Sequence, residues 1–262
     1  MSKPTDPKVS DIDNPSEIWS FFPSRIIECL KNLESIELTN VPSQEVIFQL
    51  EELNVEESHM ASVLDQLWNL YLRGLDNLMH IWKRGPKRIL GFGNMRFLTV
   101  YECNSLTFLF SPSIAKLLVM LERITVVDCE KIEEILARAG EEEEEKDVLF
   151  HKVNHICLGG LPRLKYFCPE TNASKWPSLE KMIVYGCPSL STFIPSDLNT
   201  PKLERVYDEE RSRHEKGGTC HWKGELNATI EHIFKGKVWH ILTTNISLVG
   251  EFKLFCINHR TI

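Results

Sequence analysis

The chain has 262 residues, of which 42 % are hydrophobic and 26 % are charged, and its formal net charge is -7. This composition excludes a wholly disordered chain, and 30 basic residues interspersed among 37 acidic ones provide no basic field for a nucleic-acid partner. No apolar run approaches the roughly 18 residues of a membrane-spanning helix, so we expect no membrane span.

Residues 1–29 begin polar and proline-rich, and they lack the apolar core of a secretory signal peptide. This predicts a cytoplasmic location. An apolar stretch follows at residues 18–29, so we expect residues 1–29 to form an irregular lead that caps the first structural unit. Eight cysteines are scattered along the chain without a Cys-x-x-Cys pair, which favours reduced thiols over disulfides.

From residue 30 onward, one pattern recurs, with apolar residues at positions one, four, six and twelve and Cys or Leu at position nine. Its clearest copy begins at Leu121, and weaker copies begin at Leu33, Leu50 and Leu203. The starts at Leu67, Met95, Leu121, Val153, Leu179 and Leu203 lie 28, 26, 32, 26 and 24 residues apart. Spacings of about 20 to 29 residues are typical of leucine-rich repeats.

Apolar positions four and six alternate with polar residues, which predicts a short β-strand in each repeat. The later apolar positions should turn the chain back along the convex side as a helix or a tighter turn. The prediction is therefore an α/β leucine-rich-repeat solenoid, a horseshoe with a parallel concave sheet and about seven to eight repeats. We expect residues 1–29 to be the lead, 30–210 the repeat domain and 211–262 a C-terminal tail.

Several stretches match something narrower than a generic repeat. They are Phe-Leu-Phe-Ser-Pro-Ser-Ile-Ala-Lys-Leu-Leu at 108–118, Asp-Cys-Glu-Lys-Ile-Glu-Glu-Ile at 128–135, Leu-Gly-Gly-Leu-Pro-Arg-Leu at 158–164 and Trp-Pro-Ser-Leu-Glu-Lys at 176–181. With His-Trp-Lys-Gly-Glu-Leu at 221–226, they resemble the carboxy-terminal repeats of plant intracellular immune receptors of the coiled-coil, nucleotide-binding, leucine-rich-repeat family. The resemblance covers about residues 30–235.

The resemblance implies a non-enzymatic protein-interaction module that contributes recognition or autoinhibition in plant defence. Its implied partner is a pathogen effector, a guarded host protein, or a nucleotide-binding domain in cis or in trans. Residues 85–91 lack the Gly-Lys-Ser/Thr ending of a phosphate-binding loop, so we expect no ATP-driven switching here. We expect an isolated repeat module, a truncated relative or a fragment of a longer receptor.

A substrate-receptor subunit of a ubiquitin ligase is the alternative function, because such subunits also use leucine-rich repeats. That interpretation needs an F-box-like helical segment, which residues 1–29 hardly provide. We predict no catalytic, cofactor or metal site, because no catalytic grouping has sequence context. His151 and His155 are expected to diverge along a strand.

Strand positions three, five and seven should face the concave surface, since successive side chains alternate between the two faces. There the first repeats are acidic and the later ones are basic and aromatic. Arg and aromatic residues are enriched at protein-interface hot spots, although solvated strand positions of high β propensity would look similar. The candidate protein-binding residues are Tyr71, Arg73, Phe97, Tyr101, Arg123, Lys181, Tyr185, Arg205 and Tyr207.

The acidic run Glu141–Glu145 lies in the longest interval between strands. Five like charges repel one another and stay solvated, so we expect an exposed convex loop. A docking site for a basic partner is the functional alternative for this run.

Overall fold

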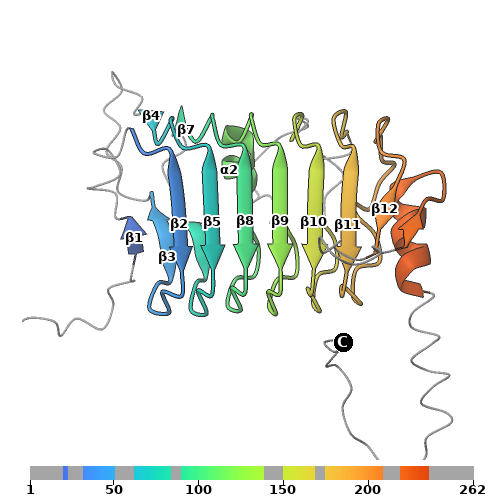
Figure 1. The fold of residues 1–262 in the computed structure, drawn as a ribbon, viewed down its shortest axis with the longest axis horizontal. Coiled ribbons are helices and arrows are strands. Elements are labelled where there is room, and N and C mark those ends of the chain that lie inside the picture. Colours follow the sequence, from blue (N-terminus) through green and yellow to red (C-terminus); the bar gives the residue numbers. More distant parts are fainter. Residues whose placement is uncertain are drawn as a thin grey trace, which may run out of the picture.

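A parallel sheet of stacked repeats is the main feature of the computed structural model, which describes residues 20–22, 32–50, 62–83, 90–138, 150–168, 175–208 and 219–235. Within these residues the largest sheet has eight strands, in the order β13-β12-β11-β10-β9-β8-β5-β2 (Figure 1). Their bounds are β2 Ser35–Thr39, β5 Asn69–Arg73, β8 Phe97–Tyr101, β9 Arg123–Val127, β10 His155–Gly159, β11 Lys181–Tyr185, β12 Val206–Tyr207 and β13 Cys220–His221. The strands from β2 to β12 are parallel and equivalent residues pair, as in Ile124 with Ile156. The predicted leucine-rich-repeat solenoid is confirmed.

The weak copy that begins at Leu50 does not add a strand to this sheet. Strand β2 pairs directly with β5, which leaves no strand between them. Leu50 instead follows strand β3 (Val46–Gln49) in the opposite layer and is fully buried there. The prediction of a sheet strand in this copy is therefore wrong, and its expected concave positions 52, 54 and 56 lie outside the described residues.

The opposite layer is built from short elements. Strands β1 (Ser20–Phe22), β3 and β6 (His80–Lys83) form one small sheet, and β4 (Ser62–Val63) pairs with β7 (Leu90–Gly91). Helix α2 (Pro112–Leu117) lies behind the main sheet in Figure 1. It begins where the Ser111 hydroxyl accepts a hydrogen bond from the Ile114 backbone and a proline occupies the first turn, a favourable start for a helix.

The repeated apolar positions form the core between the two layers. In the clearest repeat, Leu121, Ile124, Val126, Cys129 and Ile132 are all fully buried, as the pattern predicts. A line of aromatic rings joins successive repeats: Phe48, Trp82, Phe110, Phe150 and Trp176 have consecutive centroid separations of 6.2, 5.8, 5.4 and 5.5 Å. Each repeat therefore buries its core against its neighbours, which is why several are needed for stability.

The chain leaves each strand through a left-handed residue at position eight of the repeat. The backbone angle φ there is between 54° and 64° in six repeats, at Asn40, Gly74, Glu102, Asp128, Gly160 and Gly186. Glycine adopts this conformation without cost, and Asn and Asp tolerate it better than other residues. The recurrence of Gly, Asn and Asp at this position has a backbone cause.

Position nine explains the repeated cysteines. The Cys129 thiol donates to the Val127 carbonyl oxygen at 3.5 Å and accepts from the Cys103 backbone N–H, with 3.4 Å between nitrogen and sulfur. The Cys187 thiol donates to the Tyr185 carbonyl oxygen at 3.2 Å. Each thiol is buried and satisfies a backbone group where the strand ends.

Residues 219–235 follow the last repeat and pack against it. Strand β13 pairs antiparallel with β12, and residues 226–235 are helical. Leu226 and Ile230 are fully buried in the core. The Asn227 side chain accepts from the Phe193 backbone N–H at 2.8 Å and donates to the Ile194 carbonyl oxygen at 2.9 Å. This part of the expected tail therefore satisfies backbone groups of the preceding repeat.

Candidate functional site

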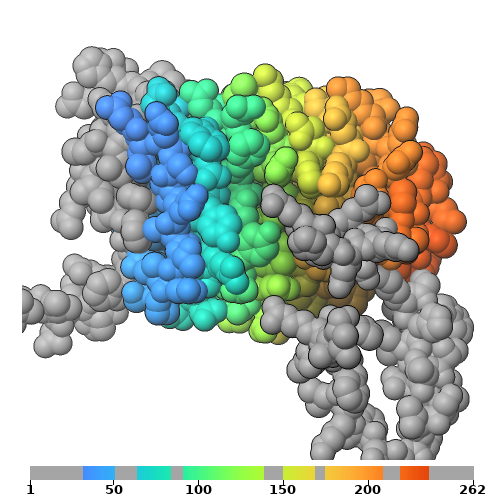
Figure 2. Space-filling model, in the orientation of Figure 1, coloured from blue at the N-terminus to red at the C-terminus, as the bar shows by residue number. Residues whose placement is uncertain are grey.

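The outward positions of the main sheet form a broad surface, which we call the sheet face (Figure 2). It is the face that the sequence predicts to be concave and to bind a partner. The candidate cations Arg73, Arg123, Lys181 and Arg205 are all exposed on it. The candidate aromatic residues Tyr71, Phe97, Tyr101, Tyr185 and Tyr207 are all half-buried, so their rings are partly held by neighbours.

Strands β5 and β8 bring together one group of candidates. The rings of Tyr71 and Tyr101 have centroids 6.0 Å apart. Arg73 donates to both carboxylate oxygens of Glu102, each at 3.2 Å, and this contact raises the pKa of Arg73. The charge of Arg73 is therefore already matched within the protein.

Phe97 organises a second group at the start of β8. The guanidinium carbons of Arg96 and Arg123 lie 5.7 and 5.6 Å from its ring centroid, and Trp68 packs edge-on with centroids 5.8 Å apart. Trp68 is 40 % exposed, which is unusual for so large an apolar side chain. Strand alternation does not identify Trp68 and Arg96, because they stand at position two, just before their strands. A prediction of the surface residues identifies these side chains only if it also counts the residue before each strand.

A third group lies toward the other end of the sheet face. Val127, Cys157 and Ile183 occupy outward strand positions, yet they are only 4, 2 and 6 % exposed. Tyr101, Tyr185 and Tyr207 pack against these three side chains and form a second apolar cluster with them. The alternation rule gives the correct direction for these side chains. Val127 is nevertheless buried, because tyrosine rings cover this cluster. Thr125, at an outward position of the same strand as Val127, is only 9 % exposed.

Gly159 lets Tyr185 reach its position. A β-carbon placed on Gly159 would lie 2.2 Å from the ring carbon Cζ of Tyr185, so the ring occupies the space above the glycine. Strand β10 thus has no side chain at Gly159, and the Tyr185 ring of β11 covers the backbone there. The outward glycine in the strand is explained by this close approach.

The candidate residues do not converge on one pocket. Five strand spacings separate β5 from β12, and neighbouring strands lie about 4.8 Å apart, so Tyr71 and Tyr207 are about 24 Å apart. The sheet face is an extended surface with ordered aromatic groups, a geometry suited to a macromolecule more than to a small ligand.

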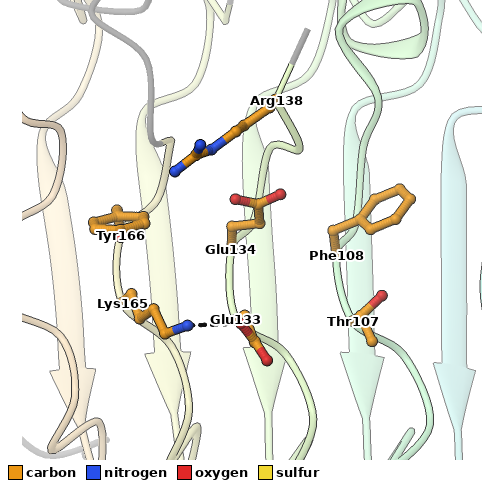
Figure 3. A pocket seen from close by; sticks show the side chains of 7 residues that line it. All are labelled: Thr107, Phe108, Glu133, Glu134, Arg138, Lys165 and Tyr166. Atoms are coloured by element: carbon orange, nitrogen blue, oxygen red, sulfur yellow. Dashed lines mark hydrogen bonds and ion pairs between the residues drawn. The ribbon is translucent and has the colours of Figure 1, made fainter. Parts of the chain in front are cut away.

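A shallow pocket of about 310 Å³ lies on the other side of the repeats, after position twelve (Figure 3). Glu134 stands between Phe108 and Tyr166, which come from the two neighbouring repeats. Lys165 and Glu133 form an ion pair at 2.8 Å at the edge of this pocket.

Burial raises the pKa of Glu134, and a backbone hydrogen bond and the positive charge of Arg138 counter that shift. The pocket's two carboxylates are thus each matched by a neighbouring cation. Its charges balance without a ligand, and we assign it no function.

Other predicted features are only partly covered by the structure. The acidic run Glu141–Glu145 lies outside the described residues. Among the described residues, no cluster of three or more His, Cys, Asp or Glu side chains is arranged to hold a metal ion. No helix in the described ranges is long and apolar enough to cross a membrane.

Comparison with known proteins agrees with the repeat architecture. Residues 8–130 match the family model of the leucine-rich repeats of RPS2-like plant disease resistance proteins. No curated protein and no solved structure gives a significant match. The match supports the resemblance found from the sequence and extends over the strands from β1 to β9. Residues 8–130 are therefore similar to the leucine-rich-repeat region of RPS2-like plant disease resistance proteins.

Proposed function

We propose that the chain is a non-enzymatic, cytoplasmic protein-interaction module of a plant disease-resistance protein, and that its sheet face contacts the partner. The partner classes are a pathogen effector, a guarded host protein, or a nucleotide-binding domain in cis or in trans. The family match gives no support to the ubiquitin-ligase alternative.

One observation carries this proposal: the exposed face presents Arg and aromatic side chains that intramolecular contacts already hold in place. The Phe97 ring has the guanidinium carbons of Arg96 and Arg123 at 5.7 and 5.6 Å from its centroid, and three tyrosines pack against an apolar cluster. Side chains ordered before binding lose less conformational entropy when a partner docks, which favours affinity. Arg and Tyr are also the types that dominate measured interface energies.

The test compares two triple alanine variants, one with its substitutions on the sheet face and one with its substitutions outside the strands. The first replaces Tyr101, Arg123 and Tyr185 by alanine on the sheet face. The second replaces Lys131, Lys152 and Arg163 by alanine, three exposed residues outside the strands. Each immobilised variant is incubated with leaf extract, and the retained proteins are quantified by mass spectrometry against the unaltered chain.

We expect the first variant to lose proteins that the unaltered chain and the second variant retain. Removing Tyr101 and Tyr185 uncovers an apolar cluster, so circular dichroism and thermal unfolding must show that the variant is folded. An additional variant, Arg123→Ala alone, removes no ring from that cluster. Retention of the same proteins by all folded variants would refute the proposal.

A further inference from the structure

A row of basic side chains crosses four consecutive strands at their first outward position. Arg123 on β9 pairs in register with His155 on β10, which pairs with Lys181 on β11. Met182 pairs with Val206, so Arg205, the residue before β12, continues the row beside Lys181. Three strand spacings of about 4.8 Å give the row a length of about 14 Å. We call these four residues the basic row.

Within the part of the chain that the structure describes, the charges of the basic row are not matched by ion pairs. Among the described residues, none of Arg123, Lys181 and Arg205 forms an ion pair, whereas Arg73 on the same face is paired with Glu102. The acidic residues that precede Arg123 and Lys181 are engaged elsewhere. Glu122 pairs with Arg96 at 2.9 Å, and Glu180 pairs with Lys202 at 3.5 Å.

Like charges on neighbouring strands destabilise a sheet, and here His155 alone separates Arg123 from Lys181. The pKa of His155 is lowered to about 4, first by burial and then by the charges of Lys181 and Arg123. His155 is therefore neutral near neutral pH and adds no further repulsion. Repulsion between the cations of the row lowers the stability of the sheet. Proteins tolerate such locally unfavourable arrangements mainly at functional sites, so the row is a candidate binding site.

The surroundings of the row favour a polypeptide. The apolar cluster under Tyr101, Tyr185 and Tyr207 lies directly beside it on the same strands. Three cations are too few for a nucleic-acid duplex, whose protein partners contact about six to ten phosphates. An extended peptide rises about 3.3 Å per residue, so about five residues span the row.

We propose that the basic row of Arg123, His155, Lys181 and Arg205 binds an acidic, extended segment of a protein partner, laid across the starts of strands β9 to β12. This proposal rests on the proposed function and adds the chemistry of the partner. The carboxylates of the segment pair with the row's cations, which form no ion pair with another described residue, and its apolar side chains reach the tyrosines next to the row.

The experiment measures binding of a fluorescein-labelled peptide of eight glutamates by fluorescence anisotropy in 50 mM salt, with a peptide of eight glutamines as the neutral probe. One variant carries Arg123→Glu, Lys181→Glu and Arg205→Glu. The matched control carries Lys131→Glu, Lys152→Glu and Arg163→Glu, so both variants have the same net charge. All six residues are exposed, and circular dichroism must show that both variants are folded.

We expect the unaltered chain to bind the glutamate peptide and not the glutamine peptide. Reversal of the basic row should weaken binding by about tenfold or more, the combined effect of three modest ion pairs, and the matched control should change it less than twofold. Equal losses in both variants would show general charge attraction and overturn the proposal. So would equal binding of the glutamine peptide, or binding of an eight-nucleotide single strand through the same row as tightly as the glutamate peptide.

A second readout is the titration of His155 followed by nuclear magnetic resonance. Carboxylates placed beside the imidazole favour its protonated form, so the bound peptide should raise the pKa of His155. An unchanged pKa under saturating peptide would contradict the assigned position. If these tests fail while sheet-face variants still lose proteins from leaf extract, the partner chemistry is wrong and the proposed function stands.

Discussion

Substitution of Gly160 by alanine tests whether the left-handed residue at position eight is required by the repeat. Gly160 has a φ of +58°, and a β-carbon there would lie 2.1 Å from the carboxylate oxygen Oδ1 of Asp128 in the preceding repeat. Placing a non-glycine residue in this conformation costs roughly 1 to 2 kcal/mol. Alanine also narrows the unfolded ensemble, which returns about 0.4 to 1 kcal/mol.

The Asp128 side chain must also move, since its oxygen occupies the space that the new methyl group needs. We therefore expect Gly160→Ala to lower the free energy of unfolding by about 2 kcal/mol. The assay is urea unfolding followed by far-ultraviolet circular dichroism. The midpoint should fall while the slope of the transition stays the same, because the surface exposed on unfolding is unchanged.

Two glycines of the chain serve as matched controls. Gly93 has ordinary backbone angles and no atom within 4 Å of a built β-carbon, so Gly93→Ala should leave stability unchanged or raise it by up to about 1 kcal/mol. Gly224 has a φ of +90° and equally open space, so Gly224→Ala reports the backbone effects without a steric clash. If Gly160→Ala proves as stable as Gly93→Ala, the reasoning about position eight is refuted.

Further predictions concern the cysteines, His155 and the first residues. Burial raises the pKa of Cys103 to about 11 and the pKa values of Cys129 and Cys187 to about 12. Iodoacetamide at pH 8 should therefore modify the exposed Cys220 and leave these three thiols unmodified in the folded chain. Rapid labelling of the three, measured by peptide mass spectrometry, would contradict this prediction. The folded pKa of His155, about 4, lies below its ordinary 6.5, so the unfolded chain binds the proton first and stability should fall as the pH drops from about 6.5 to 4. His155→Gln should remove this part of the pH dependence in urea titrations, and an unaltered profile would argue against it. Deletion of residues 1–29 removes strand β1, which pairs with β3, and should cause the chains to associate, as measured by light scattering. A deletion variant that stays monomeric would show that the N-terminal end of the solenoid needs no cap. Purified protein should hydrolyse no ATP, and sustained turnover would overturn the non-enzymatic assignment.

The repeat period is sufficient to predict the main sheet, because each apolar position of the repeat occupies one place in the fold. Leu121, Ile124 and Val126 must face inward for the strand to pack, and they do. The copy at Leu50 failed because periodicity does not distinguish the two layers: Val46, Ile47 and Phe48 supply the buried residues of a strand on the other side. A short apolar run has the same appearance in either layer.

The sheet face was predicted less completely, because alternation fixes direction and does not fix exposure. Val127 points outward as expected, but Tyr101 and Tyr185 come from other repeats and cover its cluster. Sequence distance conceals this contact, since Cys157 and Tyr185 lie 28 residues apart in the chain. The left-handed conformation at position eight could have been predicted from the sequence, because three repeats have a glycine there: Gly74, Gly160 and Gly186.

Photocrosslinking can show whether a partner docks on the sheet face or on the opposite layer. A benzoylphenylalanine replaces Tyr101 on the sheet face in one variant and Phe108, in the pocket of the opposite layer, in the other. Both replacements exchange a half-buried aromatic residue for a larger one. In leaf extract under ultraviolet light, the account predicts protein adducts from position 101 and none from position 108. Adducts from position 108 alone would contradict it.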